Sequence, residues 1–168
     1  MPLAKLRGFL DSNQIKYELI SHATAYTAQG TAATAHVGGD ELAKTVIVKL
    51  DDTFAMAVLP ASRRVDLATL QTATGAKSLR LASELEFKDL FPDCDTGAMP
   101  PFGNLYGMQV FVEETLAGKQ EIAFNAGSHT ELMRLAYADF CRLMKPMVLK
   151  FSLARARAAA IGADDRLW

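Results

Sequence analysis

The chain has 168 residues, of which 50% are hydrophobic and 22% are charged, and its formal net charge is -1. This composition is typical of a globular domain with its own core, and it excludes a disordered, collagen-like or disulfide-rich chain. The near-neutral charge argues against a protein that coats duplex DNA, because such binding needs many phosphate contacts, but it allows an enzyme that grips only the end of an RNA.

The two cysteines, Cys94 and Cys141, are far apart and have no other metal-binding residues at a short fixed spacing. We therefore expect neither a zinc cluster nor a disulfide framework, and a reducing compartment. Asp93 and Asp95 flank Cys94 and would raise the pKa of its thiol, which argues against a nucleophile. Basic residues and a glycine interrupt the apolar N-terminus, so it resembles neither a signal peptide nor a membrane span. We expect a cytoplasmic protein that binds no membrane, metal or other cofactor.

The first 60 residues predict two helices and three strands. Leucines spaced by three and four residues favour an amphipathic helix over residues 2–10, and alternating apolar and polar residues favour a strand over 15–20. A stretch rich in alanine and threonine and closed by glycine favours a short helix over 27–36. Two apolar, β-branched runs, 45–50 and 54–59, have the spacing of a hairpin.

The middle of the chain predicts two capped helices and a shaped loop. Asp66 can cap a helix that runs to about residue 74, and Ser83 with Glu86 forms a capping box for a helix that ends near residue 91. Residues 93–107 are dense in glycine and proline and predict a loop without regular structure. Strands are predicted over 109–112 and 122–124.

The C-terminal part is harder to interpret. Leucines in 130–137 suit a helix, while the apolar character of this stretch also suits a buried strand; we favour a strand followed by a helix over 138–144. Pro146 ends this unit, which places the domain over 1–146 and leaves 147–168 as a C-terminal extension. An alanine- and arginine-rich segment, 154–160, predicts an accessory helix there.

Three segments, in this order along the chain, resemble a known family. They read KTVIV from Lys44, GAMPPFG from Gly97 and NAGSH from Asn125. Together they resemble the YbaK/prolyl-tRNA synthetase-associated domain family of aminoacyl-tRNA deacylases, over about residues 15–146. The resemblance implies an α/β (mixed α+β) single domain with a curved, mostly antiparallel mixed sheet surrounded by helices, in which the three segments meet around one pocket.

The resemblance also implies a reaction, the hydrolysis of the ester that joins a wrongly attached amino acid to the terminal adenosine of a transfer RNA. Lys44 is the expected key residue: as an ammonium it would hold the substrate carbonyl or the ribose and phosphate, and as a neutral amine it would act as a base. His129 would donate to a substrate oxygen or position a water. Both are predicted catalytic residues.

The predicted substrate site draws on all three segments. Gly97 and Gly127 permit close approach of the backbone to a ligand, although glycines more often only make turns. Thr45 could lend a hydroxyl or pack within its strand, and Phe102 could line an amino-acid pocket or fill the core. The full substrate-binding set is Thr45, Gly97, Ala98, Met99, Pro100, Phe102, Gly127, Ser128 and Tyr26.

The guanidinium groups of Arg63 and Arg64 suit the phosphates of the acceptor stem, or are simply solvated. The form of the PPFG sequence resembles branches that clear small residues such as serine, threonine or 2-aminobutyrate. Alanine and cysteine stay among the candidates, and the expected RNA is the proline transfer RNA or a related one. An aminoacyl-tRNA synthetase or an elongation factor is a possible partner, and the protein is expected to be a monomer or homodimer. Two alternatives stay open: a non-catalytic RNA-binding or regulatory module, and a lysine Schiff-base enzyme acting on a small carbonyl compound.

Overall fold

The structure, a computed structural model, describes residues 3–154 of the chain. Its strands are β1 Tyr17–Ser21, β2 Leu42–Leu50, β3 Thr53–Pro60, β4 Arg63–Val65, β5 Leu79–Leu81, β6 Gln109–Glu113, β7 Glu121–Ser128, β8 Glu131–Ala136, β9 Met147–Leu149 and β10 Ser152–Ala154. Its α-helices are α1 Ala4–Ser12, α2 Ala28–Ala35, α3 Leu67–Thr74, α4 Glu84–Phe87, α5 Glu114–Ala117 and α6 Tyr137–Met144. Two 3-10 helices, η1 Lys88–Leu90 and η2 Gly103–Leu105, complete the set.

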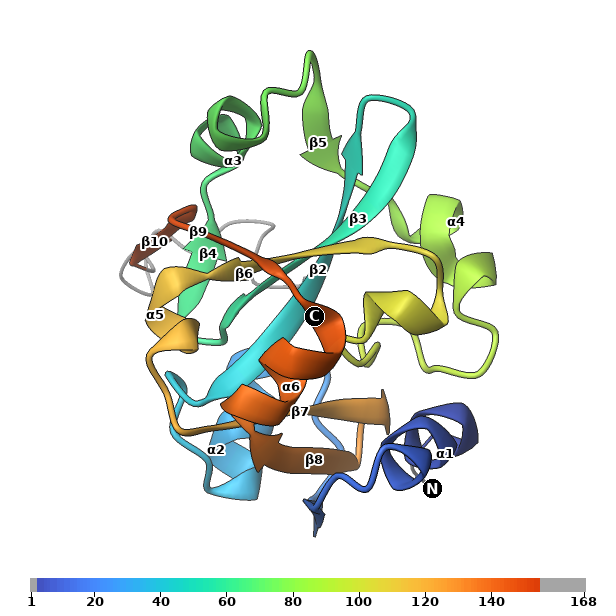
Figure 1. The fold of residues 1–168 in the computed structure, drawn as a ribbon. Coiled ribbons are helices and arrows are strands. Elements are labelled where there is room, and N and C mark those ends of the chain that lie inside the picture. The colour runs from blue at the N-terminus through green and yellow to red at the C-terminus, as the bar shows by residue number, and fades with distance from the viewer. Residues whose placement is uncertain (1–2, 155–168) are drawn as a thin grey trace.

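Most strands belong to one mixed sheet with the order β1-β8-β7-β2-β3-β6-β9, and β5 also pairs with β2. The pairs β1–β8, β7–β8, β2–β3 and β2–β5 are antiparallel. The pairs β2–β7, β3–β6 and β6–β9 are parallel. Figure 1 shows the strand direction turning from β8 to β6, so that the sheet curls, with helices around it. The expected mixed α/β domain with a curved sheet is confirmed.

The predicted caps of α3 and α4 are confirmed, and α2 has a cap that was not predicted. The Thr27 side chain accepts a hydrogen bond from the backbone N–H of Gly30 at the start of α2. Asp66 does the same for Thr69 at the start of α3, and Ser83 and Glu86 form the complete capping box of α4. These caps satisfy N–H groups that have no partner within the first turn of a helix.

Two helices pack against opposite faces of the sheet around β7 (Figure 1). On one face, small side chains of α2 pack with apolar side chains of β2, β7 and β8; the residues of this cluster, which we call the α2 face, include Ala28, Ala32, Leu42, Ala123 and Leu132. On the other face lies the larger core, to which α6 contributes Phe140 and β7 contributes Phe124. The alternation of side chains along β7 therefore sends neighbouring residues into two different environments.

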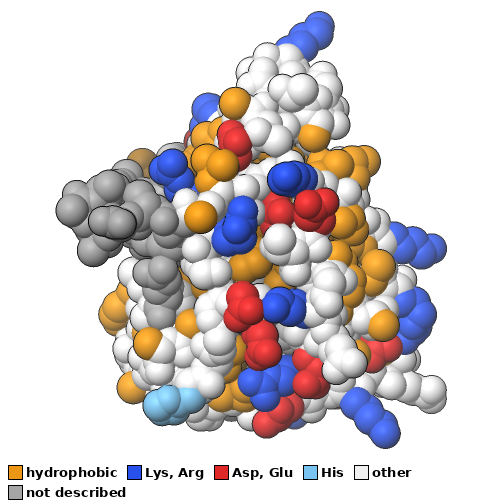
Figure 2. All heavy atoms as spheres, turned by 90° about the vertical axis from the view of Figure 1, so that its left-hand side faces the viewer, with side chains coloured by type: hydrophobic (Ala, Val, Ile, Leu, Met, Phe, Trp, Pro, Cys, Tyr) orange, Lys and Arg blue, Asp and Glu red, His pale blue; other side chains and the backbone are white. Residues whose placement is uncertain are grey.

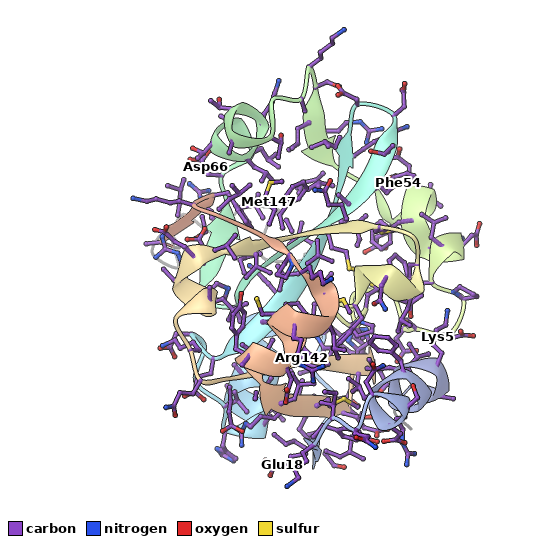
Figure 3. The ribbon with its side chains drawn as sticks, viewed as in Figure 1. Lys5, Glu18, Phe54, Asp66, Arg142 and Met147 are labelled. Atoms are coloured by element: carbon purple, nitrogen blue, oxygen red, sulfur yellow. The ribbon has the colours of Figure 1, made fainter. Side chains whose placement is uncertain are left out.

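The domain does not end at residue 146. Strand β9 pairs with β6 in the main sheet and β10 pairs with β4, so residues 147–149 and 152–154 are strands within the fold. Figure 3 shows Met147 on β9 and Asp66 at the start of α3. Strands β9 and β10 have three residues each, too few to show an alternating pattern in the sequence. The predicted helix over 154–160 lies, beyond Ala154, outside the described residues.

A buried carboxylate ties this C-terminal segment to the sheet. Glu113, at the end of β6, is 1% exposed, and its Oε2 accepts a hydrogen bond from the backbone N–H of Phe151 at 2.7 Å. We expect Glu113→Ala to lower the free energy of unfolding by about 2 to 3 kcal/mol, because it leaves a buried N–H without its charged acceptor. Urea unfolding measures this loss. The matched control is Glu114→Ala, which changes the exposed neighbouring carboxylate and should alter stability by less than about 0.5 kcal/mol. Equal losses for the two variants would contradict the proposed tie.

Candidate functional site

Lys44 lies near the start of β2 and is only 3% exposed. Strand β2 runs parallel to β7, and their last pair in register is Ala43 with Phe124. The next residue of β2 is Lys44 and the next residue of β7 is Asn125. Since paired residues of neighbouring strands share a face and side chains alternate along each strand, Lys44 and Asn125 leave the same face of the sheet side by side.

This face is the one that α2 covers. The preceding pair on the same side is Leu42 with Ala123, and both belong to the small apolar cluster beneath α2. Asn125 pairs across to Leu132, which belongs to the same cluster. The first segment, at Lys44, and the third, at Asn125, therefore meet on two adjacent strands, with small apolar side chains beside them.

The second segment is docked onto the third by backbone hydrogen bonds. The pairing of β7 with β8 shifts between Asn125 and Ser128, which marks a bulge. Within it, the Gly127 N–H donates to the Ala98 carbonyl at 3.0 Å, and the Gly127 carbonyl accepts from the Asp95 N–H at 2.8 Å. The bulge and the loop that contains Gly97 thus form one connected backbone structure.

Both motif glycines have positive φ angles, 89° at Gly97 and 101° at Gly127, a region that favours glycine. A Cβ on Gly127 would also lie 3.3 Å from the Cβ of Leu3. The Gly97 N–H points to the Met99 sulfur at 3.2 Å. The Gly127 N–H therefore holds the two loops together, and the Gly97 N–H bonds within its own loop. A close approach of either glycine to a ligand stays a prediction.

His129 follows the bulge and connects two further loops. Its Nε2 lies 2.8 Å from the carbonyl oxygen of Thr96, and because a carbonyl only accepts, this nitrogen is the donor. In the neutral ring, Nδ1 is then the acceptor. The His129 carbonyl accepts from the Ala25 N–H at 3.2 Å, which holds the loop before α2 against the bulge.

Tyr26 lies in that loop, and its ring centroid is 4.9 Å from that of His129. Its side chain is 71% exposed. The structure therefore brings Tyr26 to His129, as part of the same surface, rather than placing it in a closed amino-acid pocket. The sequence could not show whether Tyr26 lies at the surface or in a pocket, because the exposure of a loop residue depends on what packs over it.

Phe102 is a core residue. It is fully buried, and its ring contacts those of Phe9, Phe124 and Phe140 at centroid distances of 6.2, 5.4 and 5.5 Å. Of the two roles considered from the sequence, the structure therefore assigns core packing. Met99 likewise belongs to the main core cluster. Ala98 and Pro100 are also buried.

Thr45 lies on the opposite face of the sheet from Lys44, and Ser128 lies at the end of β7. Thr45 follows Lys44 on a regular stretch of β2, so its side chain leaves the opposite face of the sheet. The Ser128 hydroxyl lies 3.3 Å from that of Thr130, within the turn between β7 and β8. Thr45 is buried in the strand, and its Oγ1 has no hydrogen-bond partner among the described residues, so its role in substrate binding stays a prediction.

The two arginines differ in their surroundings. Arg63 on β4 donates through Nε to the Ser152 hydroxyl at 2.5 Å and through Nη2 to the Ser152 carbonyl at 3.0 Å, which ties β4 to β10. Arg64 is exposed. A contact with transfer RNA phosphates stays a prediction for both residues, and Arg64 is the more accessible of the two.

Cys94 is not activated. Burial, and to a lesser extent the charge of Asp93, raise the pKa of its thiol, as the flanking carboxylates suggested. Within residues 3–154, no three histidine, cysteine, aspartate or glutamate side chains are placed to hold a metal ion. No helix in the described part of the chain is long and apolar enough to cross a membrane.

Asn125 is the residue that the predicted set omitted, although it begins the third segment. It is 7% exposed, and its Oδ1 is buried without a hydrogen-bond partner among the described residues. The alternation of β7 would have placed its side chain opposite that of Phe124. Only the register between β7 and β2 places Asn125 on the same sheet face as Lys44.

The fold and the joined segments define a class of protein, and comparison with known families identifies it. Residues 22–143 match the model of the aminoacyl-tRNA editing domain, and the chain belongs to this family. It is accordingly an enzyme of the hydrolase class that acts on aminoacyl-tRNA esters. The family resemblance carried by the three segments is confirmed.

Individual relatives agree with this assignment. The Multifunctional Ser/Thr-tRNA deacylase ProXp-y of Escherichia coli (strain K12) is 25% identical over 152 residues, which cover 88% of this chain and 90% of that protein. The crystal structure of the hypothetical protein APE2540 matches with a TM-score of 0.79 and 20% identity, over 89% of this chain and 99% of that one. A candidate trans-editing enzyme for prolyl tRNA synthetase matches with a TM-score of 0.75 and 20% identity, over 89% and 96% of the two chains. The structural matches establish the shared fold.

Proposed function

We propose that the protein is a trans-editing deacylase that removes a small hydroxylated amino acid, serine or threonine, from a transfer RNA that carries it wrongly. The observation that supports this proposal is the buried Lys44 on the same sheet face as Asn125, next to the two docked glycine loops. The small side chains Ala123 and Ala28 on this face suit a short aminoacyl group. The E. coli relative, a Ser/Thr-tRNA deacylase by name, supports the hydroxylated branch.

Lys44 is the proposed oxyanion donor. Hydrolysis of an ester requires stabilisation of the charge that develops on the carbonyl oxygen. Two backbone N–H groups of the glycine loops already donate hydrogen bonds within the protein: that of Ala98 to the Asp95 carbonyl, and that of Gly127 to the Ala98 carbonyl. An ammonium group in a buried site interacts with a developing negative charge more strongly than one in water does. We therefore favour the charged form of Lys44 over a neutral base.

His129 is the proposed acceptor of the water proton. Its Nε2–H is held by the Thr96 carbonyl, so Nδ1 has the free lone pair in the neutral ring. The water oxygen bonds to the ester carbonyl carbon as its proton moves to Nδ1. The tetrahedral intermediate then collapses, the bond between that carbon and the ribose oxygen breaks, and the ribose oxygen takes the proton back. The products are the free amino acid and an uncharged transfer RNA.

Recognition of the RNA is proposed to be confined to its acceptor end. On the face shown in Figure 2, basic and acidic side chains are interleaved, in keeping with the net charge of -1. Such a surface suits few phosphate contacts, with Arg64 as an exposed candidate. The proline transfer RNA or a related one, docking on a synthetase or elongation factor, a monomeric or dimeric state and a cytoplasmic location remain predictions.

A panel of mischarged transfer RNAs tests the proposal. One transfer RNA body, charged in turn with serine, threonine, alanine, cysteine and 2-aminobutyrate, is incubated with the intact protein, and release of the amino acid is followed. We expect kcat/KM for the seryl and threonyl esters to exceed the values for the others by about 10-fold or more, the size expected from one buried hydrogen bond. Absence of hydrolysis on every member, with binding retained, would instead support an RNA-binding module. Trapping of a small carbonyl compound on Lys44 by borohydride would support a Schiff-base enzyme.

A further inference from the structure

We propose that Asn125 is the residue that reads the side-chain hydroxyl of the amino acid, through a hydrogen bond from that hydroxyl to its Oδ1. This inference rests on the proposed deacylase function and names the group that makes the site select hydroxylated substrates. The observation that supports it is a buried hydrogen-bond acceptor, Oδ1 of Asn125, on the same sheet face as Lys44.

Asn125 carries an acceptor that none of residues 3–154 uses. Its side chain is buried, and Oδ1 has no hydrogen-bond partner within the described part of the chain. A buried polar atom without a partner costs about 1 to 3 kcal/mol, so nearly all such atoms in folded proteins are satisfied. A substrate that donates a hydrogen bond to Oδ1 would recover this energy, and a substrate without a donor would not.

The depth of Asn125 indicates which end of the substrate reaches it. The terminal ribose is joined to the rest of the transfer RNA and must lie where the RNA can leave toward solvent. The aminoacyl side chain is the free end, so it enters furthest. Around Asn125 the α2 face consists of small and apolar side chains, including Ala123 and Leu132. A short side chain with one hydroxyl fits such an environment.

Charge favours a hydroxyl over the substrate's ammonium group as the donor. Lys44 and Asn125 follow the last paired residues of two adjacent strands, and neighbouring strands lie about 4.8 Å apart. An α-ammonium bound at Oδ1 would share this face of the sheet with the Lys44 ammonium, and two like charges in one buried site repel each other. A neutral hydroxyl donor meets the acceptor without this penalty.

The test compares seryl and alanyl esters on one transfer RNA, which differ only in the hydroxyl. We expect Asn125→Leu, which keeps the volume of the side chain and removes the acceptor, to lower kcat/KM for the seryl ester by about 10- to 100-fold. The value for the alanyl ester should change by less than about 3-fold, because alanine offers no donor to lose. Asn125→Asp retains an acceptor and should retain the preference for serine. Asn125→Ala replaces the leucine variant if thermal unfolding shows that the latter does not fold.

Binding provides a second readout. The 3′-amide analogues of seryl- and alanyl-adenosine cannot be hydrolysed as esters, and the wild-type protein should show the larger rise in melting temperature with the seryl analogue. Asn125→Leu should abolish the difference. Tyr137→Phe is the matched control, because it removes a buried hydroxyl at the start of α6, next to the end of β7 that lies away from Asn125, and should leave the serine preference unchanged.

Each outcome is decisive. The assignment is supported if Asn125→Leu loses the serine preference while Asn125→Asp and Tyr137→Phe keep it. An unchanged preference in that variant, or an equal loss on both esters, overturns it while leaving the deacylase function in place. A wild-type protein that hydrolyses neither ester overturns the proposed function, and the inference fails with it.

Discussion

Lys44→Ala is expected to lower kcat for hydrolysis of seryl-tRNA by about 100- to 1000-fold, the range found when one oxyanion donor is removed from an enzyme. The Lys44 side chain is only 3% exposed, so little water reaches the site. Once the ammonium is removed, water therefore cannot stabilise the charge on the carbonyl oxygen equally well. Single-turnover assays with excess enzyme measure the chemical step directly. Retention of the wild-type rate would remove Lys44 from the proposed mechanism.

Two variants separate charge from packing in this experiment. Lys44→Met preserves most of the side-chain volume without the charge, and we expect it to be as inactive as Lys44→Ala. Lys49→Ala removes another lysine from β2, one whose amine lies 3.9 Å from Glu86 at the surface. The Lys49 variant should keep the wild-type rate.

Gly103→Ala is expected to lower the free energy of unfolding by about 3 to 5 kcal/mol, a loss that arises only from a severe structural conflict. A Cβ at this position would lie 2.3 Å from the carbonyl oxygen of Met108 and 2.7 Å from a methyl group of Val110. The backbone cannot move away easily, because the Gly103 carbonyl accepts hydrogen bonds from Tyr106 and Met108, both at 2.9 Å. Equilibrium urea unfolding measures the loss.

Gly107→Ala provides the control within the same turn. Gly107 has a φ of 68°, but a Cβ added there would have nothing within 4 Å, so only the backbone conformation opposes a side chain. We expect a cost of about 1 kcal/mol. If the two variants unfold at similar urea concentrations, close packing is not the reason for the glycine at position 103, the last residue of the PPFG sequence.

Local rules in the sequence were enough for most helices and for the central hairpin. The caps predicted at Asp66 and Ser83 depend on residues three positions apart, and both form as the spacing indicates. The runs that became β2 and β3 are long and apolar enough to be recognised on their own. The order of the three motif segments likewise indicated the family before any geometry was known.

Contacts between distant segments decided the remainder. The faces on which Thr45 and Asn125 lie depend on strand registers, and a shift of one residue would exchange them. Whether Phe102 meets a ligand or the core depended on three rings from elsewhere in the chain. The strands β9 and β10 were missed because three residues carry no pattern and their pairing partners lie far away in sequence.

The sequence by itself therefore determined the family, the class of fold, the capped helices and the candidate role of Lys44, because each is expressed in short-range patterns or in motifs read in order. Only the tertiary structure placed Asn125 on the same sheet face as Lys44, used Gly127 to join two loops and returned the C-terminal segment to the sheet. The physical reason is that register, side-chain face and backbone pairing are properties of two segments at once, and neither segment alone contains them.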